Sequence, residues 1–579
     1  MTGMQTLHAA TTLMTIGLGL LTGQAHCSQT PAADRVLTGG PISTLSVSAP
    51  EVRALAMRDG LITAIGSEEE IARTIGPDTE VIALEGRRVV PGFIEGHGHF
   101  LGLGDARMQL DLRSATSWAE VIAQVAEATR RVPKGSVIRG RGWHQEKWTR
   151  TPHGAVEGLP VHNALSAISP EHPVLLRHAS GHMLFANQCA MELSGLDAQT
   201  PDPPGGTIVR DADGNPTGAL RERAAALVAA AEARARPIPL ADRAEAAMEE
   251  CLSKGVTSFQ IAGTSLRTAS AFKAMALAGE LRVRLWVMLN EPVEILARAL
   301  PQARVIGVGD QYLTVRAIKR TIDGALGSHG AWLLEPYSDL PDTHGLRLLP
   351  PAEMEAVASL ALEHDLQLCV HAIGDRANRE VLDVYQRAFA SLSEGEVPGA
   401  RRRWRIEHAQ HLDPDDLPRF AGLGVIASMQ AIHCVSDGPW VPSRLGAERS
   451  ATGAYRALDL LRSGAIVIQG TDAPVEDVDP LANFRAAVTR RMNNGEVFGP
   501  GQRMTREQAL RAATLDAAHA AFEEDIKGSL EPGKLADMVV LSHDILTLPA
   551  DQLGRARVEL TLVGGEIRYR APDSGGTRR

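Results

Sequence analysis

Six side chains that could bind a metal ion or move a proton follow apolar, β-rich runs of the sequence. One histidine at a strand end is more often a hydrogen-bonded structural residue, but six polar residues at five strand ends are hard to explain as accidents. Imidazole and carboxylate groups suit Zn2+, Mn2+ or Fe2+, and the cysteines lack the paired spacing of a thiolate zinc site. The six residues are His97, His99, Lys319, His371, His408 and Asp472.

The chemistry that such a set favours is hydrolysis. Alternate residues of an extended strand point to the same side, so His97 and His99 in "GFIEGHGH" could face one ion. Taken alone, this stretch could equally be two polar residues in a glycine-rich turn. A divalent ion lowers the pKa of bound water toward neutrality and polarises a carbonyl oxygen. Asp472, in "GTDAPV", is placed to take the proton of that water and pass it to the leaving group.

Lys319, in "VRAIKRTIDG", is the unexpected member of the set. An ammonium group would repel the ion, whereas a lysine carbamylated by CO2 would offer a bridging carboxylate. The alternative is a protonated lysine that pairs with Asp323 or holds the substrate.

The elements that must position these residues alternate between helix and strand. In "AEAAMEECLSKGVTSFQIAG" an amphipathic helix stops at Gly255 and a buried strand follows. The same unit recurs along the middle of the chain and gives about eight strands, the number that a (β/α)8 barrel of TIM type needs. A doubly wound sheet, the alternative α/β fold, needs fewer strands. In a barrel the polar residues at the strand ends would meet at one face.

The two ends of the chain are β-rich, with hairpin signals such as Asp59-Gly60, and they predict one composite β-sandwich domain assembled from both termini. Between the first and second barrel strands the helix–strand repeat lapses, which predicts an inserted domain. The predicted division is a signal peptide at 1–25, an N-terminal sandwich segment at 34–92, barrel strand one at 93–110, the inserted segment at 111–225, the remaining barrel at 226–520 and a C-terminal sandwich segment at 521–572.

The first 25 residues, with the apolar run "TTLMTIGLGLLTGQA", are typical of an export signal, although they contain no Lys or Arg. We therefore expect a periplasmic or secreted protein with no integral membrane span after processing; an unprocessed leader is the alternative. Cys27 raises the question of lipidation, but the residues before it are a poor lead-in. The net charge of −10 argues against a nucleic-acid surface. We expect a small-molecule substrate, and a homo-oligomer is compatible with the sequence.

Several motifs carry a resemblance to a known group. The stretches "PGFIEGHGH", "HAIGD", "RIEHAQ", "GTDAPV" and "GKLADMVVL" resemble the amidohydrolase superfamily. More narrowly, "IKRTIDGALGSHGAWL", "GHMLFANQ" and "GGTIVRDADGNPTGALRE" are similar to its YtcJ-like branch, amidohydrolase family 3, which includes N-substituted formamide deformylases. The resemblance implies a barrel with a composite β-sandwich and an inserted domain. It also implies metal-dependent hydrolysis, usually of C–N bonds.

Carried over by position, the resemblance assigns a role to each of the six residues. The four histidines would bind one or two divalent ions, most simply Zn2+, Lys319 would be the carbamylated bridge, and Asp472 would be both ligand and general base. One position departs from the family pattern, because Glu95 stands where the family usually has Asp. We expect Glu95 to contact the ligands rather than the ion.

Other polar residues are candidates for the substrate side of the site. Asn187 could line the substrate or serve loop hydrogen bonding, and Arg405 and Glu407 flank His408 as candidate ion partners within the barrel. The leading hypothesis is an amidohydrolase acting on an amide or N-acyl bond. Alternatives are a lactonase, a deaminase or another hydrolase on the same metal site, or a binding protein without turnover. The candidate substrate-binding residues are His182, Asn187, Gln430 and His433.

Overall fold

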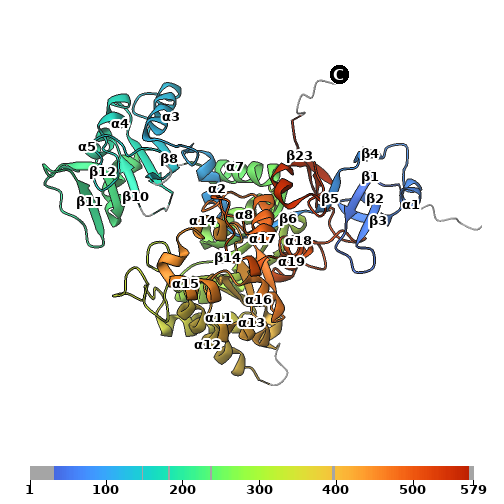
Figure 1. Ribbon diagram of the computed structural model, residues 1–579. Coiled ribbons are helices and arrows are strands. Elements are labelled where there is room, and N and C mark those ends of the chain that lie inside the picture. Colours follow the sequence, from blue (N-terminus) through green and yellow to red (C-terminus); the bar gives the residue numbers. More distant parts are fainter. Residues whose placement is uncertain are drawn as a thin grey trace, which may run out of the picture.

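The computed structural model describes residues 32–145, 148–179, 181, 183–234, 238–393 and 398–572. Figure 1 shows a central barrel, an inserted domain on one side of it, and a β-rich domain built from both ends of the chain on the other. The predicted signal peptide and His182 lie outside the described residues, so export stays a prediction. In the portion of the chain that is described, no helix has the length and apolarity that crossing a membrane requires.

Eight parallel strands form the barrel, and their order in the sheet follows their order in the chain. In a doubly wound sheet the order of the strands reverses partway across the sheet, and no such reversal occurs here. The predicted (β/α)8 barrel is therefore confirmed, and the alternative fold is excluded. The strands are β6 (Phe93–Gly98), β13 (Val256–Thr264), β14 (Arg284–Leu289), β16 (Leu313–Thr321), β17 (Gln367–Ala372), β18 (Arg405–His408), β19 (Ile426–Met429) and β20 (Val467–Gln469).

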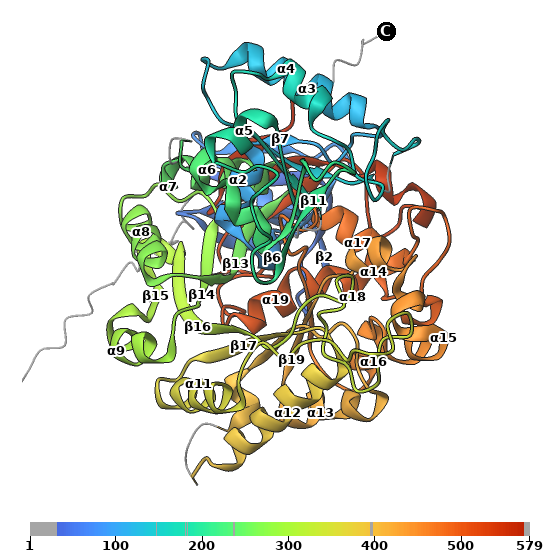
Figure 2. The ribbon, with the colours of Figure 1, turned by 90° about the vertical axis from the view of Figure 1, so that its left-hand side faces the viewer.

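Helices surround the barrel strands, as Figure 2 shows. Helix α7 (Leu240–Ser253) ends where predicted, because Gly255 takes a positive φ of 80° and turns the chain into β13. At the opposite end from the strand-end residues, α19 (Leu515–Ala520) lies across the barrel, where Gln260 and Gln367 donate to its carbonyls. The other surrounding helices include α8 (Leu266–Leu277), α9 (Val293–Ala303), α11 (Pro351–Glu363), α12 (Asp375–Ala390), α13 (Leu417–Leu423), α16 (Ala457–Arg462) and α18 (Arg506–Ala512).

The first and last barrel strands meet through backbone hydrogen bonds at the carboxyl end of the barrel. The amide of Asp472 donates to the carbonyl of His97 (2.8 Å), and the amide of His99 donates to the carbonyl of Ala473 (2.7 Å). Gly96 permits this approach, because a Cβ there would lie 2.5 Å from the carbonyl oxygen of Gln469. Barrel closure and the position of the strand-end residues are therefore set by the same contacts.

The β-rich domain confirms the prediction that both termini build one unit. Strand β5 pairs with β21, which joins the N-terminal and C-terminal segments in a single hydrogen-bonded path around a shared apolar core. The strands are β1 (Arg35–Ser43), β2 (Glu51–Arg58), β3 (Leu61–Gly66), β4 (Glu80–Ala83), β5 (Arg88–Pro91), β21 (Met538–Leu541), β22 (Val558–Val563) and β23 (Glu566–Arg570).

The inserted domain, confirmed between the first two barrel strands, is a six-stranded sheet with its own apolar core. Helix α2 (Phe100–Arg107) precedes it and α7 follows it. Its elements are β7 (Leu110–Asp111), α3 (Trp118–Arg131), β8 (Ile138–Trp143), α4 (Asn163–Ile168), β9 (Val174–His178), β10 (Met183–Ala186), α5 (Gln188–Leu193), β11 (Gly206–Arg210), β12 (Pro216–Glu222) and α6 (Ala229–Ala233).

One buried ion pair fastens the β-rich domain to the barrel. Arg284 on β14 binds both carboxylate oxygens of Asp537, at 2.7 and 3.0 Å, and Asp537 also accepts from the amide of Gly564. Asp537 belongs to the "GKLADMVVL" motif, which therefore serves domain docking.

We predict that Asp537→Ala lowers the free energy of unfolding by about 3–5 kcal/mol, because it leaves the Arg284 guanidinium buried without its partner. Urea unfolding followed by circular dichroism measures the change. Glu127→Ala, which removes an exposed partner of Arg130 and Arg131, should cost under about 1 kcal/mol. Equal losses in the two variants would contradict the docking role.

Candidate active site

A cavity of about 1430 Å³ opens at the carboxyl ends of the barrel strands, between the barrel and the inserted domain. Barrel loops form most of its wall, and the inserted domain adds His178, Met183, Arg221 and Glu222. The structure thus brings the six strand-end residues to one place, as a barrel requires. All six line this cavity: His97, His99, Lys319, His371, His408 and Asp472.

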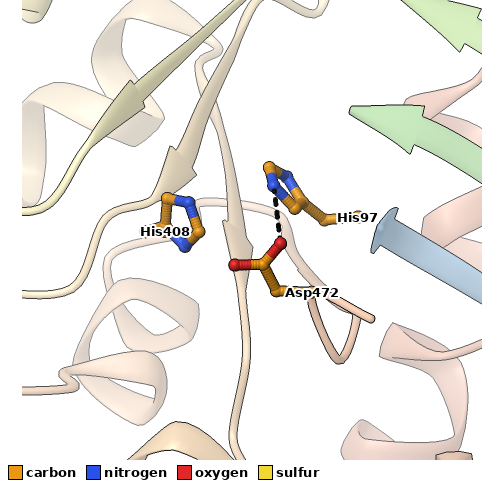
Figure 3. A group of neighbouring side chains, drawn as sticks. All are labelled: His97, His408 and Asp472. Carbon is orange, nitrogen blue, oxygen red and sulfur yellow. Dashed lines mark ion pairs between the residues drawn. The ribbon is translucent and has the colours of Figure 1, made fainter. Parts of the chain in front are cut away.

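Three of these side chains converge closely enough to hold one ion. The candidate ligand atoms of His97, His408 and Asp472 all lie within 4.8 Å of one another, and all three residues are buried. Figure 3 shows the two imidazole rings and the carboxylate directed toward a common space. The His97 Nε2 atom lies 3.6 Å from Asp472 Oδ1.

The other three residues surround this group. His99 Nε2 lies 3.2 Å from Asp472 Oδ1, but its side chain is 43% exposed and stands at the rim, directly before α2. The His371 ring packs against the His408 ring with their centroids 4.5 Å apart. Lys319, on β16, is buried. The six residues therefore form a buried group around His97, His408 and Asp472, with His99 on the side that is open to solvent.

Burial keeps three histidines of the cavity, His97, His371 and His408, neutral. Burial, with the nearby Lys319, lowers the pKa of His97 to about 4 and that of His371 to about 3. Neutral imidazole is the form that binds metal ions. Burial opposes ionisation of Asp472, but the hydrogen bond from His99 and the neighbouring histidines hold its pKa well below the usual range. At neutral pH the buried histidines therefore present neutral nitrogens and Asp472 presents a carboxylate.

His97 is oriented by a buried ion pair. Its Nδ1 atom hydrogen-bonds to Glu407, and Arg405 holds the other carboxylate oxygen of Glu407 at 2.7 Å. Because Nδ1 is occupied, Nε2 is the atom that faces Asp472, an arrangement typical of metal-binding histidines. The predicted ion partnership of Arg405 and Glu407 is confirmed, and its function is to fix the His97 ring.

His408 is oriented by Gln430, which was predicted to contact substrate. Gln430 Oε1 lies 2.8 Å from His408 Nδ1, and its amide nitrogen donates to the carbonyl of Ser428. Gln430 is not among the residues that line the cavity. Both ends of its amide group are occupied, so its role in the structure is to hold the ring of His408.

Glu95 contacts the loop that carries Asp472. Its carboxylate accepts hydrogen bonds from the Thr471 amide (2.6 Å) and the Thr471 hydroxyl (2.9 Å). Burial raises the pKa of Glu95 to about 8 despite these hydrogen bonds. As expected from the sequence, this residue acts on a neighbour of the strand-end residues and does not line the cavity.

Asp323 does not pair with Lys319. Its carboxylate accepts from the backbone amides of Trp332, Ile373 and Gly374, at 2.8 to 3.0 Å, and lies 3.5 Å from His371 Nε2. The structure therefore gives no support to the Lys319–Asp323 pair that the sequence left open.

The remaining candidates for the substrate side differ in position. His433 lines the cavity, and its Nε2 atom is buried without a hydrogen-bond partner. Asn187 lies away from the cavity and caps α5: its oxygen accepts from the Val174 and Ala190 amides, and its nitrogen donates to the Ser169 and His172 carbonyls. Loop hydrogen bonding, the alternative for Asn187, is therefore what the structure shows.

Of the inserted-domain residues that line the cavity, sequence reasoning considered Glu222, either as an acid at the start of a helix or as a residue facing the site, and did not identify the others. Met183 and Arg221 are cross-strand partners on β10 and β12, and Glu222 ends β12 with a positive φ of 49°. The quoted stretch "GALRE" contains Arg221 and Glu222, but nothing in its composition shows which face of the strand meets the barrel.

Comparisons with known proteins agree with this geometry. The amidohydrolase family matches residues 80–569. The chain is 35% identical to Protein LONG AFTER FAR-RED 3 of Arabidopsis thaliana (93% of this chain, 92% of that protein). It is 27% identical to the N-substituted formamide deformylase of Arthrobacter pascens (93% and 99%). A metal-dependent hydrolase from Pyrococcus horikoshii OT3, solved but uncharacterized, has a TM-score of 0.71 at 27% identity (89% and 99%).

We predict that Asn187→Ala destabilises the protein by about 1–3 kcal/mol, because buried backbone groups of the inserted domain lose their partners. Urea unfolding followed by tryptophan fluorescence reports on this domain, whose core contains Trp118, Trp143 and Trp148. Asn494→Ala, at an exposed asparagine, should leave the unfolding midpoint unchanged. An Asn187→Ala variant as stable as the wild-type protein would contradict this structural role of Asn187.

Proposed function

The chain belongs to the amidohydrolase family and is a metal-dependent hydrolase, and from this premise we propose that it hydrolyses an amide or N-acyl C–N bond of a small molecule. The observation that carries the proposal is the convergence of His97, His408 and Asp472 at the floor of a large cavity. The similarity to a relative named for deformylation of N-substituted formamides supports the choice of a C–N bond.

The residues of the site fit a divalent cation, and we propose Zn2+, as one or two ions. His371 Nε2 is buried without a hydrogen-bond partner, which is costly unless something binds it. Nitrogen and carboxylate donors without thiolates are the ligands of catalytic zinc sites. The proposed ligands are His97, His99, His371, His408, Asp472 and carbamylated Lys319. When bound, such an ion supplies Lewis acidity, which acidifies water and polarises a carbonyl group.

Lys319 is suited to carbamylation by its burial. Burial lowers the pKa of its amine, which favours the neutral, nucleophilic form that reacts with CO2. The carbamate that forms is an anion, which attracts a divalent cation, whereas the ammonium group of an unmodified lysine would repel it.

Asp472 is proposed to move the proton of the reaction. As a carboxylate it accepts a proton from the attacking water, and as a carboxylic acid it donates that proton to the leaving nitrogen. An amide is thereby converted to a carboxylic acid and an amine. His433, with its unpaired Nε2 atom in the cavity, would offer a hydrogen bond to the substrate.

We predict that chelation abolishes hydrolysis and that Asp472→Asn lowers kcat by about 10²–10⁴ while the protein retains metal. Metal analysis coupled to a screen of N-acyl amino acids, formamides, lactones and cyclic amides measures both properties and identifies the bond. Asp525→Asn, at an exposed aspartate, is the control. Full activity in metal-free protein would refute the hypothesis that hydrolysis depends on a metal ion. A near-normal rate in Asp472→Asn would show that Asp472 is not the general base.

We predict that the native mass of the metal-loaded protein exceeds the sequence mass by one CO2 in addition to the metal. The added CO2 should be lost on acidification and should not form in Lys319→Arg, because a guanidinium is not carbamylated under these conditions. Native mass spectrometry measures it. An unmodified Lys319 in the fully metal-loaded protein would refute the proposal that a carbamylated Lys319 is a metal ligand.

A further inference from the structure

Another cavity, of about 340 Å³, lies where the inserted domain meets the barrel. We call it the junction cavity. Helices α2 and α7 form its barrel side, while β8, β9, β10 and α6 form the other side. Figure 1 shows α2 and α7 at this junction. The junction cavity shares no lining residue with the active-site cavity.

Guanidinium groups dominate the wall of the junction cavity. Arg139, Arg177 and Arg243 all line it. The Nε atoms of Arg139 and Arg243 are buried without a hydrogen-bond partner. Arg243 does bind Asp105 through another nitrogen, whereas Arg139 lies 3.9 Å from Glu232, beyond hydrogen-bond distance. Two arginines of the wall therefore each have a guanidinium nitrogen that no protein acceptor satisfies.

Arg177 lies next to a further arginine in the sheet and has no acidic partner among the described residues. Arg141 on β8 lies directly beside Arg177 on β9 in the strand register, and like charges in such positions repel. Among the described residues, neither arginine forms an ion pair with a carboxylate; Arg177 donates only a long hydrogen bond, 3.5 Å, to the carbonyl of Gly181.

The charge balance identifies the chemistry of a ligand. Three guanidinium groups, Arg139, Arg177 and Arg243, and two carboxylates, Asp105 and Glu232, line the cavity, which leaves an excess of one positive charge there in a chain whose net charge is −10. Guanidinium forks match the oxygens of phosphate, and the cavity volume suits a small ligand. We propose that the junction cavity binds a tetrahedral phosphate anion: inorganic phosphate or the phosphate group of a small phosphomonoester.

Such a ligand would connect the two domains. Arg139 and Arg177 belong to the inserted domain, whereas Arg243 belongs to α7 and its partner Asp105 to α2, the helix that begins directly after His99. An anion held by both groups would strengthen the contact between the inserted domain and the barrel. This inference is independent of the reaction at the metal site.

Isothermal titration calorimetry of the metal-loaded protein tests the proposal, with inorganic phosphate and glycerol 3-phosphate as separate ligands and chloride at matched ionic strength. We expect one saturable site per chain for at least one of the two, and the tighter ligand identifies the source of the phosphate group. Arg139→Gln and Arg177→Gln should each weaken binding by at least about tenfold. Arg130→Gln, on the exposed face of α3, should bind as the wild type does.

Two further measurements do not depend on losing an arginine. Glu232→Gln removes a competing carboxylate and should tighten binding by roughly two- to fivefold. Hydrogen exchange of the wild-type protein should show phosphate-dependent protection in α2, β8 and β9. The proposal is overturned if neither ligand binds, if binding is unchanged in both arginine variants, or if protection is confined to the loops of the metal site.

Discussion

The buried ion pair between Arg405 and Glu407 determines the geometry on which the candidate metal site depends. Neither side chain has any exposed surface, and removing one partner of such a pair costs about 3–5 kcal/mol. Glu407 holds the ring of His97, while Arg405 binds the carbonyl of Gly96 on β6 and the hydroxyl of Ser428 on β19. Three strands of the barrel are thus fixed relative to one another by one cation, and the same contacts fix the direction of His97 Nε2.

Closure of the barrel adds a second constraint of the same kind. Gly96 and Gly470 allow β6 and the end of β20 to approach, and a Cβ at Gly470 would lie 2.5 Å from the amide of His97. The backbone hydrogen bonds formed there place His97 and Asp472 opposite each other. A polar site at the mouth of a barrel has to resist solvation and thermal motion, and here the first strand and the segment after the last strand, which carry His97 and Asp472, are bonded to each other through the main chain.

The sequence alone was sufficient for the strand pattern and hence for the meeting of six polar residues at one end of the barrel. It was not sufficient for the direction of individual side chains beyond the strand ends. His408 and Asp472 have φ values of 74° and 57°, a left-handed conformation that is rare for residues with a Cβ, and there the rule of alternating faces no longer applies. Gln430 illustrates the same limit, because only the folded loop shows that its amide is occupied by His408.

Glu95 shows how a departure from the family pattern can leave the metal site intact. Its carboxylate reaches the backbone and the hydroxyl of Thr471, the residue before Asp472, so it connects β6 to the loop that carries the proposed base. An extra methylene at this position changes how that loop is held without adding a group to the cavity. The inserted domain contributes His178, Met183, Arg221 and Glu222 to the wall that faces the strand ends. The barrel thus carries the candidate ligands and most of the cavity wall, and the inserted domain supplies the rest of that wall.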